Sequence, residues 1–193
     1  MKIFSPLYSK VMTWSKHKYA PYYLYLTAFV ESIFWPIPVD IMLAPMALAK
    51  PKLAWRYALG ATLFSVLGGA LGYYIGHALY EPVVLPFIEF MQYQSKMQTA
   101  QEWFSYWGVM IVFIASFTPI PFKVFTITAG VMSMAFIPFV LTALVGRGLR
   151  FFLVAGLMVL GGEKMEAKLS KYIDILSWIT IVLAMLLYFL LKS

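Results

Sequence analysis

The sequence reads Pro36-Ile37-Pro38-Val39-Asp40 inside one apolar stretch and, 83 residues later, Pro119-Ile120-Pro121-Phe122-Lys123 inside another. A helix cannot continue through paired prolines without losing hydrogen bonds and clashing with its preceding turn. The residue before each proline is also driven away from helical geometry. The two phrases therefore predict two broken helices, and their breaking residues are Pro36, Pro38, Pro119 and Pro121.

The composition places these breaks in a membrane. The chain has 193 residues, of which 62% are hydrophobic and only 12% are charged, whereas a soluble domain carries about 25% charged residues. In lipid, backbone groups freed by a helix break are tolerated only where protein or a wet cavity satisfies them. Two broken segments at corresponding places in two halves indicate the substrate site of a transporter.

The first half of the chain predicts a hairpin that enters and leaves on one side. Residues 1–19 have the spacing of an amphipathic surface helix rich in lysine. The apolar segments 20–35 and 37–49 are each shorter than the roughly 20 residues that a span requires. Basic residues come before and after them, and basic residues mark the cytoplasmic side. We therefore expect a re-entrant hairpin, followed by a glycine-rich span at 57–80.

The second half predicts the same pattern in the opposite orientation. The polar residues 81–102 suit the outer side, and the short segments 103–117 and 124–136 flank the second break. Segments 139–160 and 173–191 are long enough to cross. Ten lysines and arginines then fall on the predicted inside and two on the outside. This bias predicts a cytoplasmic N-terminus and a C-terminus on the periplasmic or extracellular side.

The predicted fold is an all-α, multi-pass integral membrane protein built from two inverted repeats. Each repeat consists of a re-entrant broken-helix hairpin and a transmembrane helix, at 20–80 and 103–162. Together they form a membrane domain at 20–162. The amphipathic helix at 1–19 and the extra transmembrane helix at 173–191 lie outside the repeats.

Five ionisable residues fall within the apolar segments: Glu31, Asp40, Lys123, Arg147 and Arg150. An ionised group at the bilayer centre costs at least about 2.5–3.5 kcal/mol, so these residues should face one another or a wet cavity. Asp40 and Lys123 hold equivalent repeat positions and are predicted to approach each other. Arg147 and Arg150 are three residues apart and so share one helix face.

These residues predict the roles of a transport site. An arginine pair matches the geometry of phosphate, so Arg147, Arg150 and Lys123 are the candidate headgroup-binding residues. Glu31 and Asp40 are the candidate proton-coupling acids, because burial favours the neutral carboxyl and nearby cations oppose this. Other interpretations stay open: a purely structural Asp40–Lys123 pair, snorkelling arginines, a Glu31 bonded to freed backbone, and prolines that merely kink helices.

Three motifs resemble the DedA family, also called the VTT or SNARE-associated domain. Phe29-Val30-Glu31-Ser32 before the first proline phrase resembles its first motif, residues 68–76 its glycine–tyrosine helix, and residues 113–130 its second motif. The phrases T-P-I-P-F-K and G-R-G-L-R-F-F are similar to the YqaA-like branch. Ser116 and Phe122 stand where the family commonly has arginines, and Lys123 follows one place later.

The resemblance covers roughly residues 20–160 and implies inverted re-entrant hairpins that move lipids. It also implies a bacterial inner membrane, with links to undecaprenyl phosphate recycling, phospholipid translocation and proton-dependent envelope homeostasis. The function expected is therefore a transporter or flippase for an anionic lipid, with protons as the candidate coupling ion. The alternatives are a proton-coupled small-cation antiporter and a non-transporting assembly factor.

An enzyme is not expected, because the chain has two histidines, no cysteine, no metal-ligand cluster and no spacing of a nucleophile with a base. We expect no cofactor and no metal. The net charge of +7 is explained by a basic cytoplasmic face, so no nucleic-acid partner is expected. Membrane lipids are the expected partners, and homo-oligomerisation is left open.

Overall fold

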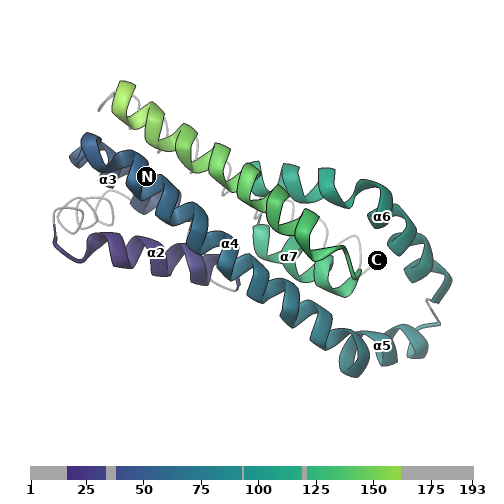
Figure 1. The fold of residues 1–193 in the computed structure, drawn as a ribbon. Helices are drawn as coiled ribbons and strands as arrows, with labels where there is room; N and C mark the ends of the chain where they lie inside the picture. Colours follow the sequence, from purple (N-terminus) through teal and green to yellow (C-terminus); the bar gives the residue numbers. More distant parts are fainter. Residues whose placement is uncertain (1–16, 34–37, 93, 119–120, 162–193) are drawn as a thin grey trace, which may run out of the picture.

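The computed structural model describes residues 17–33, 38–92, 94–118 and 121–161 (Figure 1). Every regular element in this part of the chain is a helix, which confirms the predicted all-helical architecture. Nearly all of the predicted surface helix at 1–19 lies outside the described residues. The predicted span at 173–191, Pro36 and Pro119 also lie outside them.

The first proline phrase separates two short helices. Helix α2 covers Ala20–Glu31, with Pro21 in its first turn, and α3 covers Asp40–Ala49, with the Asp40 carboxylate in its first turn. Proline at the start of a helix is already preorganised, and a carboxylate there interacts favourably with the helix dipole. At 12 and 10 residues, each helix is too short to cross a bilayer alone.

A long helix follows and carries the glycines. The one-turn helix η1 (Pro51–Leu53) leads into α4 (Ala54–Leu79), which has 26 residues. The chain stays helical through the π-helical turn η2 (Tyr80–Val84) into α5 (Leu85–Phe90). The continuous helical stretch Pro51–Phe90 is long and apolar enough to cross a membrane, in agreement with the span expected at 57–80.

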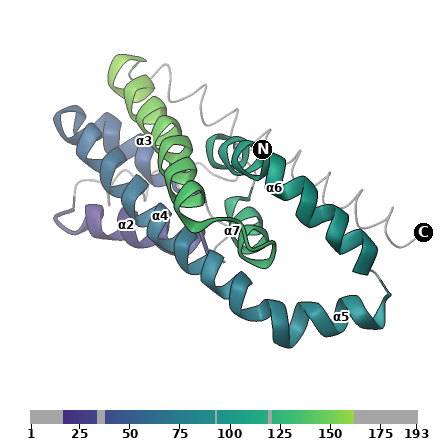
Figure 2. The same ribbon diagram turned by 45° about the vertical axis from the view of Figure 1, so that its right-hand side comes forward.

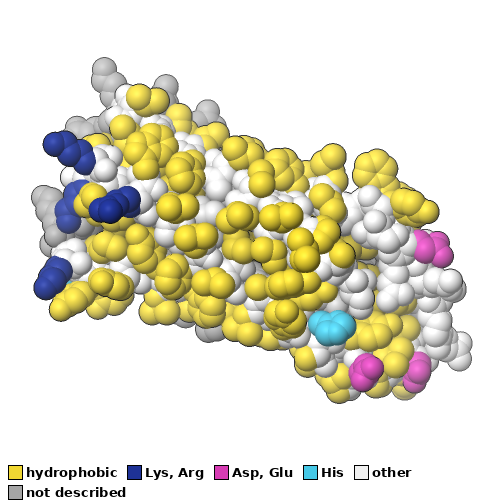
Figure 3. Space-filling view, in the orientation of Figure 1, with side chains coloured by type: hydrophobic (Ala, Val, Ile, Leu, Met, Phe, Trp, Pro, Cys, Tyr) yellow, Lys and Arg dark blue, Asp and Glu magenta, His cyan; other side chains and the backbone are white. Residues whose placement is uncertain are grey.

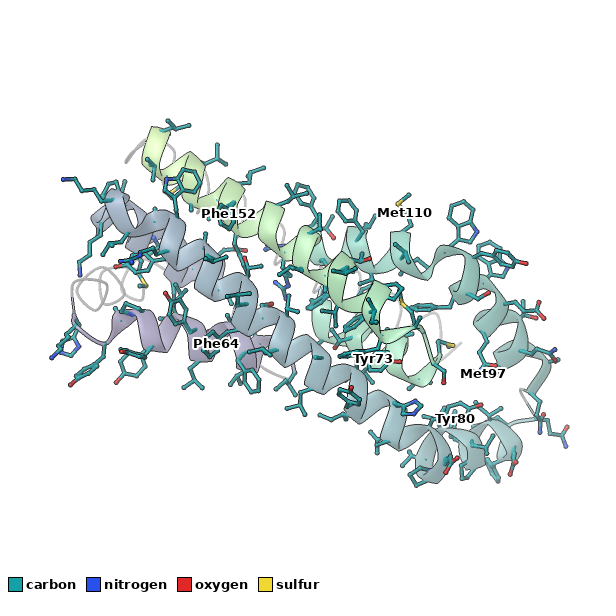
Figure 4. All side chains as sticks on the ribbon, viewed as in Figure 1. Phe64, Tyr73, Tyr80, Met97, Met110 and Phe152 are labelled. Atoms are coloured by element: carbon teal, nitrogen blue, oxygen red, sulfur yellow. The ribbon has the colours of Figure 1, made fainter. Side chains whose placement is uncertain are left out.

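The second proline phrase again lies between two helices. Helix α6 covers Gln94–Phe117, α7 covers Phe122–Val131, and Pro121 precedes the first residue of α7. The chain then turns into the helix Phe136–Gly161, called helix 136–161 below, which is also long and apolar enough to cross. The hydroxyl of Tyr73 (labelled in Figure 4) donates to the carbonyl of Met134 and so ties this turn to α4.

The start of α6 corrects one expectation. The short segment expected at 103–117 is part of a helix of 24 residues that begins at Gln94, so the last part of the polar stretch 81–102 belongs to the same helix. Glutamine, lysine, methionine and alanine are good helix formers. They extend the helix beyond its apolar part, which hydropathy alone does not reveal.

The core has two apolar clusters, one toward each end of the molecule. One joins α2, α3, the first turns of α4 (Ala54–Ala61) and the last turns of helix 136–161 (Phe151–Met158). The other joins α6, α7, a later part of α4 (Val66–Tyr73) and the first turns of helix 136–161 (Phe139–Ala143). The two long helices are therefore antiparallel and pack against both pairs of short helices. Figure 2 shows α7 between α4 and α6.

The surface is banded by residue type. Apolar side chains cover the middle of the visible face in Figure 3, lysines and arginines gather where α3 meets α4, and acidic side chains lie at the opposite end near α5. Exposed Lys52 and Arg56 belong to the basic end, and exposed Glu81 and Glu89 to the acidic end. An apolar band between two charged ends is the surface that a bilayer requires.

Candidate functional site

Two buried ion pairs join helix 136–161 to the ends of the first pair of short helices. Nη2 of Arg147 lies 3.1 Å from Oε2 of Glu31, and the side chains are 4% and 16% exposed. Nη2 of Arg150 pairs with Oδ2 of Asp40. Glu31 and Asp40, the two candidate proton-coupling acids, therefore each pair with one of the two candidate headgroup-binding arginines.

The sequence explains this geometry. Arg147 and Arg150 are one helical turn apart, so their side chains project from one face. Glu31 ends α2 and Asp40 begins α3, so the two acids lie on either side of the proline phrase. The helix break and the arginine spacing together let one helix face meet both carboxylates. Arg147 is buried, Arg150 is half-buried and each pairs with an acid, which argues against the interpretation that they snorkel.

Each ion pair leaves one buried polar atom without a hydrogen bond to the described residues. These atoms are Nε of Arg147 and Oδ1 of Asp40. On a guanidinium, Nε and Nη2 form one edge that binds two oxygens side by side. Glu31 occupies only the Nη2 half of this edge in Arg147. The unused half is a donor in a protein interior, where an unmade hydrogen bond is costly.

Several hydroxyl side chains are also buried. Oγ of Ser32 donates to the carbonyl of Ala28 at 3.0 Å and shares a hydrogen bond with Oγ of Ser65 at 2.8 Å. Thr62 Oγ1 donates to the carbonyl of Ala58. On α4 and on helix 136–161, these polar side chains fall between the two apolar clusters. We call the group the polar layer: Glu31, Ser32, Asp40, Thr62, Ser65, Ser116, Thr126, Arg147 and Arg150.

The two broken helices meet at the glycine face of α4. A Cβ added to Gly72 would lie within 3.5 Å of both Thr126 of α7 and the carbonyl of Ser32. A Cβ on Gly68 would press on the carbonyl of Phe29, and one on Gly76 on the carbonyl of Ile127. Small residues let backbones approach closely in membrane helices. Gly68, Gly72 and Gly76 thus allow the end of α2 and the middle of α7 to pack against the same part of α4.

Lys123 lies in the first turn of α7 and is half-buried, and its carbonyl accepts a hydrogen bond from Oγ1 of Thr126. The Asp40 carboxylate pairs with Arg150. The expected approach of Lys123 to Asp40 stays a prediction. The roles assigned to all five ionisable residues also stay predictions. Pro38 and Pro121 lie outside the helices, as expected of breaking residues.

The hydroxyl members of the polar layer were not among the predicted site residues. Ser65 is three residues before Gly68 and seven before Gly72, so helical periodicity places it on the glycine face. That signal was available and would have identified Ser65 as buried. No comparable pattern points to Ser32, because its burial depends on where α2 packs. Within the described residues, no group of three histidine, cysteine or acidic side chains is placed to hold a metal ion.

Comparison with known proteins identifies the family. The model of the VTT domain matches residues 37–160. An uncharacterised protein of Haemophilus influenzae is 49% identical over 193 residues, covering 100% of both chains. A protein of Staphylococcus aureus named undecaprenyl phosphate transporter A is 29% identical over 146 residues, covering 72% of this chain and 70% of its own. No solved structure matches the chain.

The family match supports a membrane transporter role in general. The domain model begins at Ile37, inside the first proline phrase, and covers α4, the second proline phrase and most of helix 136–161. The family is of transporter type, so the expectation that the chain is not an enzyme is confirmed. The chain belongs to the VTT domain family, also called DedA, and is a helical membrane protein.

Proposed function

We propose that this protein is a transporter or flippase that moves an anionic lipid across the bacterial inner membrane. The observation that carries the proposal is the polar layer, in which two arginines are held by two carboxylates between two apolar clusters. Buried ionisable residues in a membrane protein mark substrate or ion pathways. The relative named as an undecaprenyl phosphate transporter supports a phosphate-bearing lipid as substrate.

The charges favour an anionic substrate over a small cation. Each carboxylate of the polar layer is already neutralised by an arginine, so a cation finds no uncompensated negative charge there. A phosphate instead matches the side-on edge of Arg147, of which only the Nη2 half is used. Two phosphate oxygens accept from both halves of such an edge. The antiporter alternative has one observation of its own, the buried and unpartnered Oδ1 of Asp40.

Proton coupling follows from the same contacts. A carboxylate that takes up a proton loses most of its attraction for its arginine, which is then free to bind a phosphate. Glu31 and Asp40 would in this way exchange a proton for a headgroup at Arg147 and Arg150. The predicted movement is thus of a proton and an anion together.

The proposed route requires that the two broken helices enter from opposite sides. The antiparallel arrangement of α4 and helix 136–161 supports this inverted repeat, as does the position of the two apolar clusters. The basic end at the α3–α4 junction is assigned to the cytoplasm, because basic residues gather there. Substrate would then meet the polar layer near the bilayer midplane, where transporter sites of this kind lie.

The test is a translocation assay with purified protein in liposomes of phosphatidylcholine. Fluorescent phosphatidylglycerol, a fluorescent polyprenyl phosphate and fluorescent phosphatidylcholine are compared, with chemical bleaching of the outer leaflet as the readout. We expect faster movement of at least one anionic lipid than of phosphatidylcholine, and loss of that movement in Asp40→Asn. Equal rates for all three lipids, or no rate above empty liposomes, would show that the proposal is wrong.

A further inference from the structure

The guanidinium of Arg147 lies against an aromatic ring from a different helix. Its Cζ is 4.4 Å from the ring centroid of Phe122 and 5.5 Å from that of Phe151. Phe151 is one turn away on the same helix, whereas Phe122 begins α7, directly after the second proline phrase. Arg147 therefore contacts both broken helices: the end of α2 through Glu31 and the start of α7 through Phe122.

The ring of Phe122 is itself held in place. Its side chain is only 1% exposed, and it belongs to the apolar cluster of α6 and α7. On its other side it lies against α4, because a Cβ on Gly69 would come within 3.0 Å of its Cε1 and 3.3 Å of Thr126 Cγ2. Gly69, Phe122, Arg147 and Glu31 thus form a continuous series of contacts across four helices.

A guanidinium forms hydrogen bonds only at its edges, and the guanidinium carbon of Arg147 lies over the Phe122 ring, so this contact limits the directions in which those edges can point. The contact also holds a cation in a dry interior, where such attraction is strongest. An aliphatic side chain in place of Phe122 would fill the space but would make no cation–π contact to orient the guanidinium of Arg147. The contact with Phe122 therefore restricts the direction in which the unpartnered Nε–H of Arg147 points.

We propose that Phe122 is the positioning residue for the anion site. Its ring, fixed against Gly69, holds the plane of Arg147 so that Nε and Nη2 meet two phosphate oxygens when Glu31 is released. This inference rests on the proposed function, and it adds the residue that aligns the donor edge. The ligand it serves is a phosphate-bearing lipid headgroup.

The experiment observes Arg147 directly by NMR. The chain contains three arginines, Arg56, Arg147 and Arg150, so a ¹⁵N-labelled sample in uncharged detergent gives three Nε–Hε signals that arginine-to-lysine variants assign. A proton over a ring face is shifted upfield. We expect an upfield Arg147 signal in wild type that moves downfield in Phe122→Leu, while the signal of exposed Arg56 does not move.

The same signals measure binding when short-chain phosphatidylglycerol is added, with short-chain phosphatidylcholine as the control lipid. We expect Phe122→Leu to bind phosphatidylglycerol about tenfold more weakly, since cation–π contacts in dry sites contribute on that scale. Phe122→Tyr keeps the ring and should bind like wild type. The matched control is Phe139→Leu, because Phe139 is equally buried in the same cluster but packs on Tyr73 and Phe136.

The outcomes distinguish the positioning role of Phe122 from the proposed transport of an anionic lipid. An unmoved Arg147 signal in Phe122→Leu, or equal weakening in Phe139→Leu, overturns the positioning role. A wild-type protein that binds neither lipid overturns the proposed function and this inference with it. If Phe122→Leu does not fold, Gly69→Ala replaces it. The added methyl group must displace the Phe122 ring by a few tenths of an ångström, and the Arg147 signal must then move.

Discussion

Replacing Glu31 by glutamine removes the charge that Arg147 binds. The Arg147 side chain is 4% exposed and the Glu31 side chain 16%, so water does not compensate the guanidinium when the carboxylate is gone. Breaking a buried pair from one side costs about 3–5 kcal/mol. The glutamine amide still accepts a hydrogen bond, which returns about 1 kcal/mol. The expected loss of unfolding free energy is therefore about 2–4 kcal/mol.

The double variant decides whether this loss comes from the pair. Arg147→Gln leaves a buried carboxylate and loses the contact with Phe122, so we expect a loss of about 3 kcal/mol. Glu31→Gln together with Arg147→Gln leaves two neutral amides that can bond to each other. Because no charge then remains unpaired, the double variant should lose only about 1–2 kcal/mol.

The measurement is unfolding in mixed micelles by a titration with sodium dodecyl sulfate, followed by circular dichroism. The four proteins of the double-mutant cycle are compared at one temperature and detergent composition. A coupling free energy of about 2 kcal/mol or more is expected for residues in direct contact. If the two single losses simply add in the double variant, the ion pair is not an energetic unit and the description of the site is wrong.

Five further substitutions test the packing, the polar layer and the orientation. Gly76→Ala should destabilise the protein by about 1–3 kcal/mol, because its methyl group presses on a backbone carbonyl of α7. Gly148→Ala, whose nearest neighbour is at 3.7 Å, should gain up to about 1 kcal/mol in the same titration. Ser65→Ala should lose about 0.6 kcal/mol, typical of a hydrogen bond between membrane helices. In the natural cysteine-free background, an impermeant thiol reagent should label Lys52→Cys from the cytoplasmic side and Glu89→Cys from the other; labelling of both from one side contradicts the orientation.

The sequence predicts the helices where local rules dominate. Paired prolines end helices by sterics and lost hydrogen bonds, so the end of α6 at Phe117 was predicted correctly, whereas α2 ends at Glu31 and not at the expected residue 35. The long helices also follow from hydropathy and length. The start of α6 could not be predicted in this way, because polar helix formers continue a helix beyond the membrane without any apolar signal.

The sequence could predict which ionisable residues are buried together, but not which acid pairs with which arginine. Burial cost implies that Glu31, Asp40, Arg147 and Arg150 pair with something. Which acid meets which arginine depends on how helix 136–161 lies against the ends of α2 and α3. That packing is set by contacts distant in sequence, as is the position of the Phe122 ring. Repeat equivalence predicted that Lys123 approaches Asp40, but it gave no indication that Arg150 would pair with Asp40.

The most direct measurement of the central claim is lipid translocation by the double variant Glu31→Gln/Arg147→Gln. The variant retains most of its stability if the reasoning above is right, but it lacks the Arg147 guanidinium for a phosphate and the Glu31 carboxylate for a proton. We predict that it folds and no longer moves the anionic lipid that wild type moves, while Arg56→Gln, changed at an exposed arginine, keeps the wild-type rate. A folded double variant that translocates lipid at the wild-type rate would contradict the account.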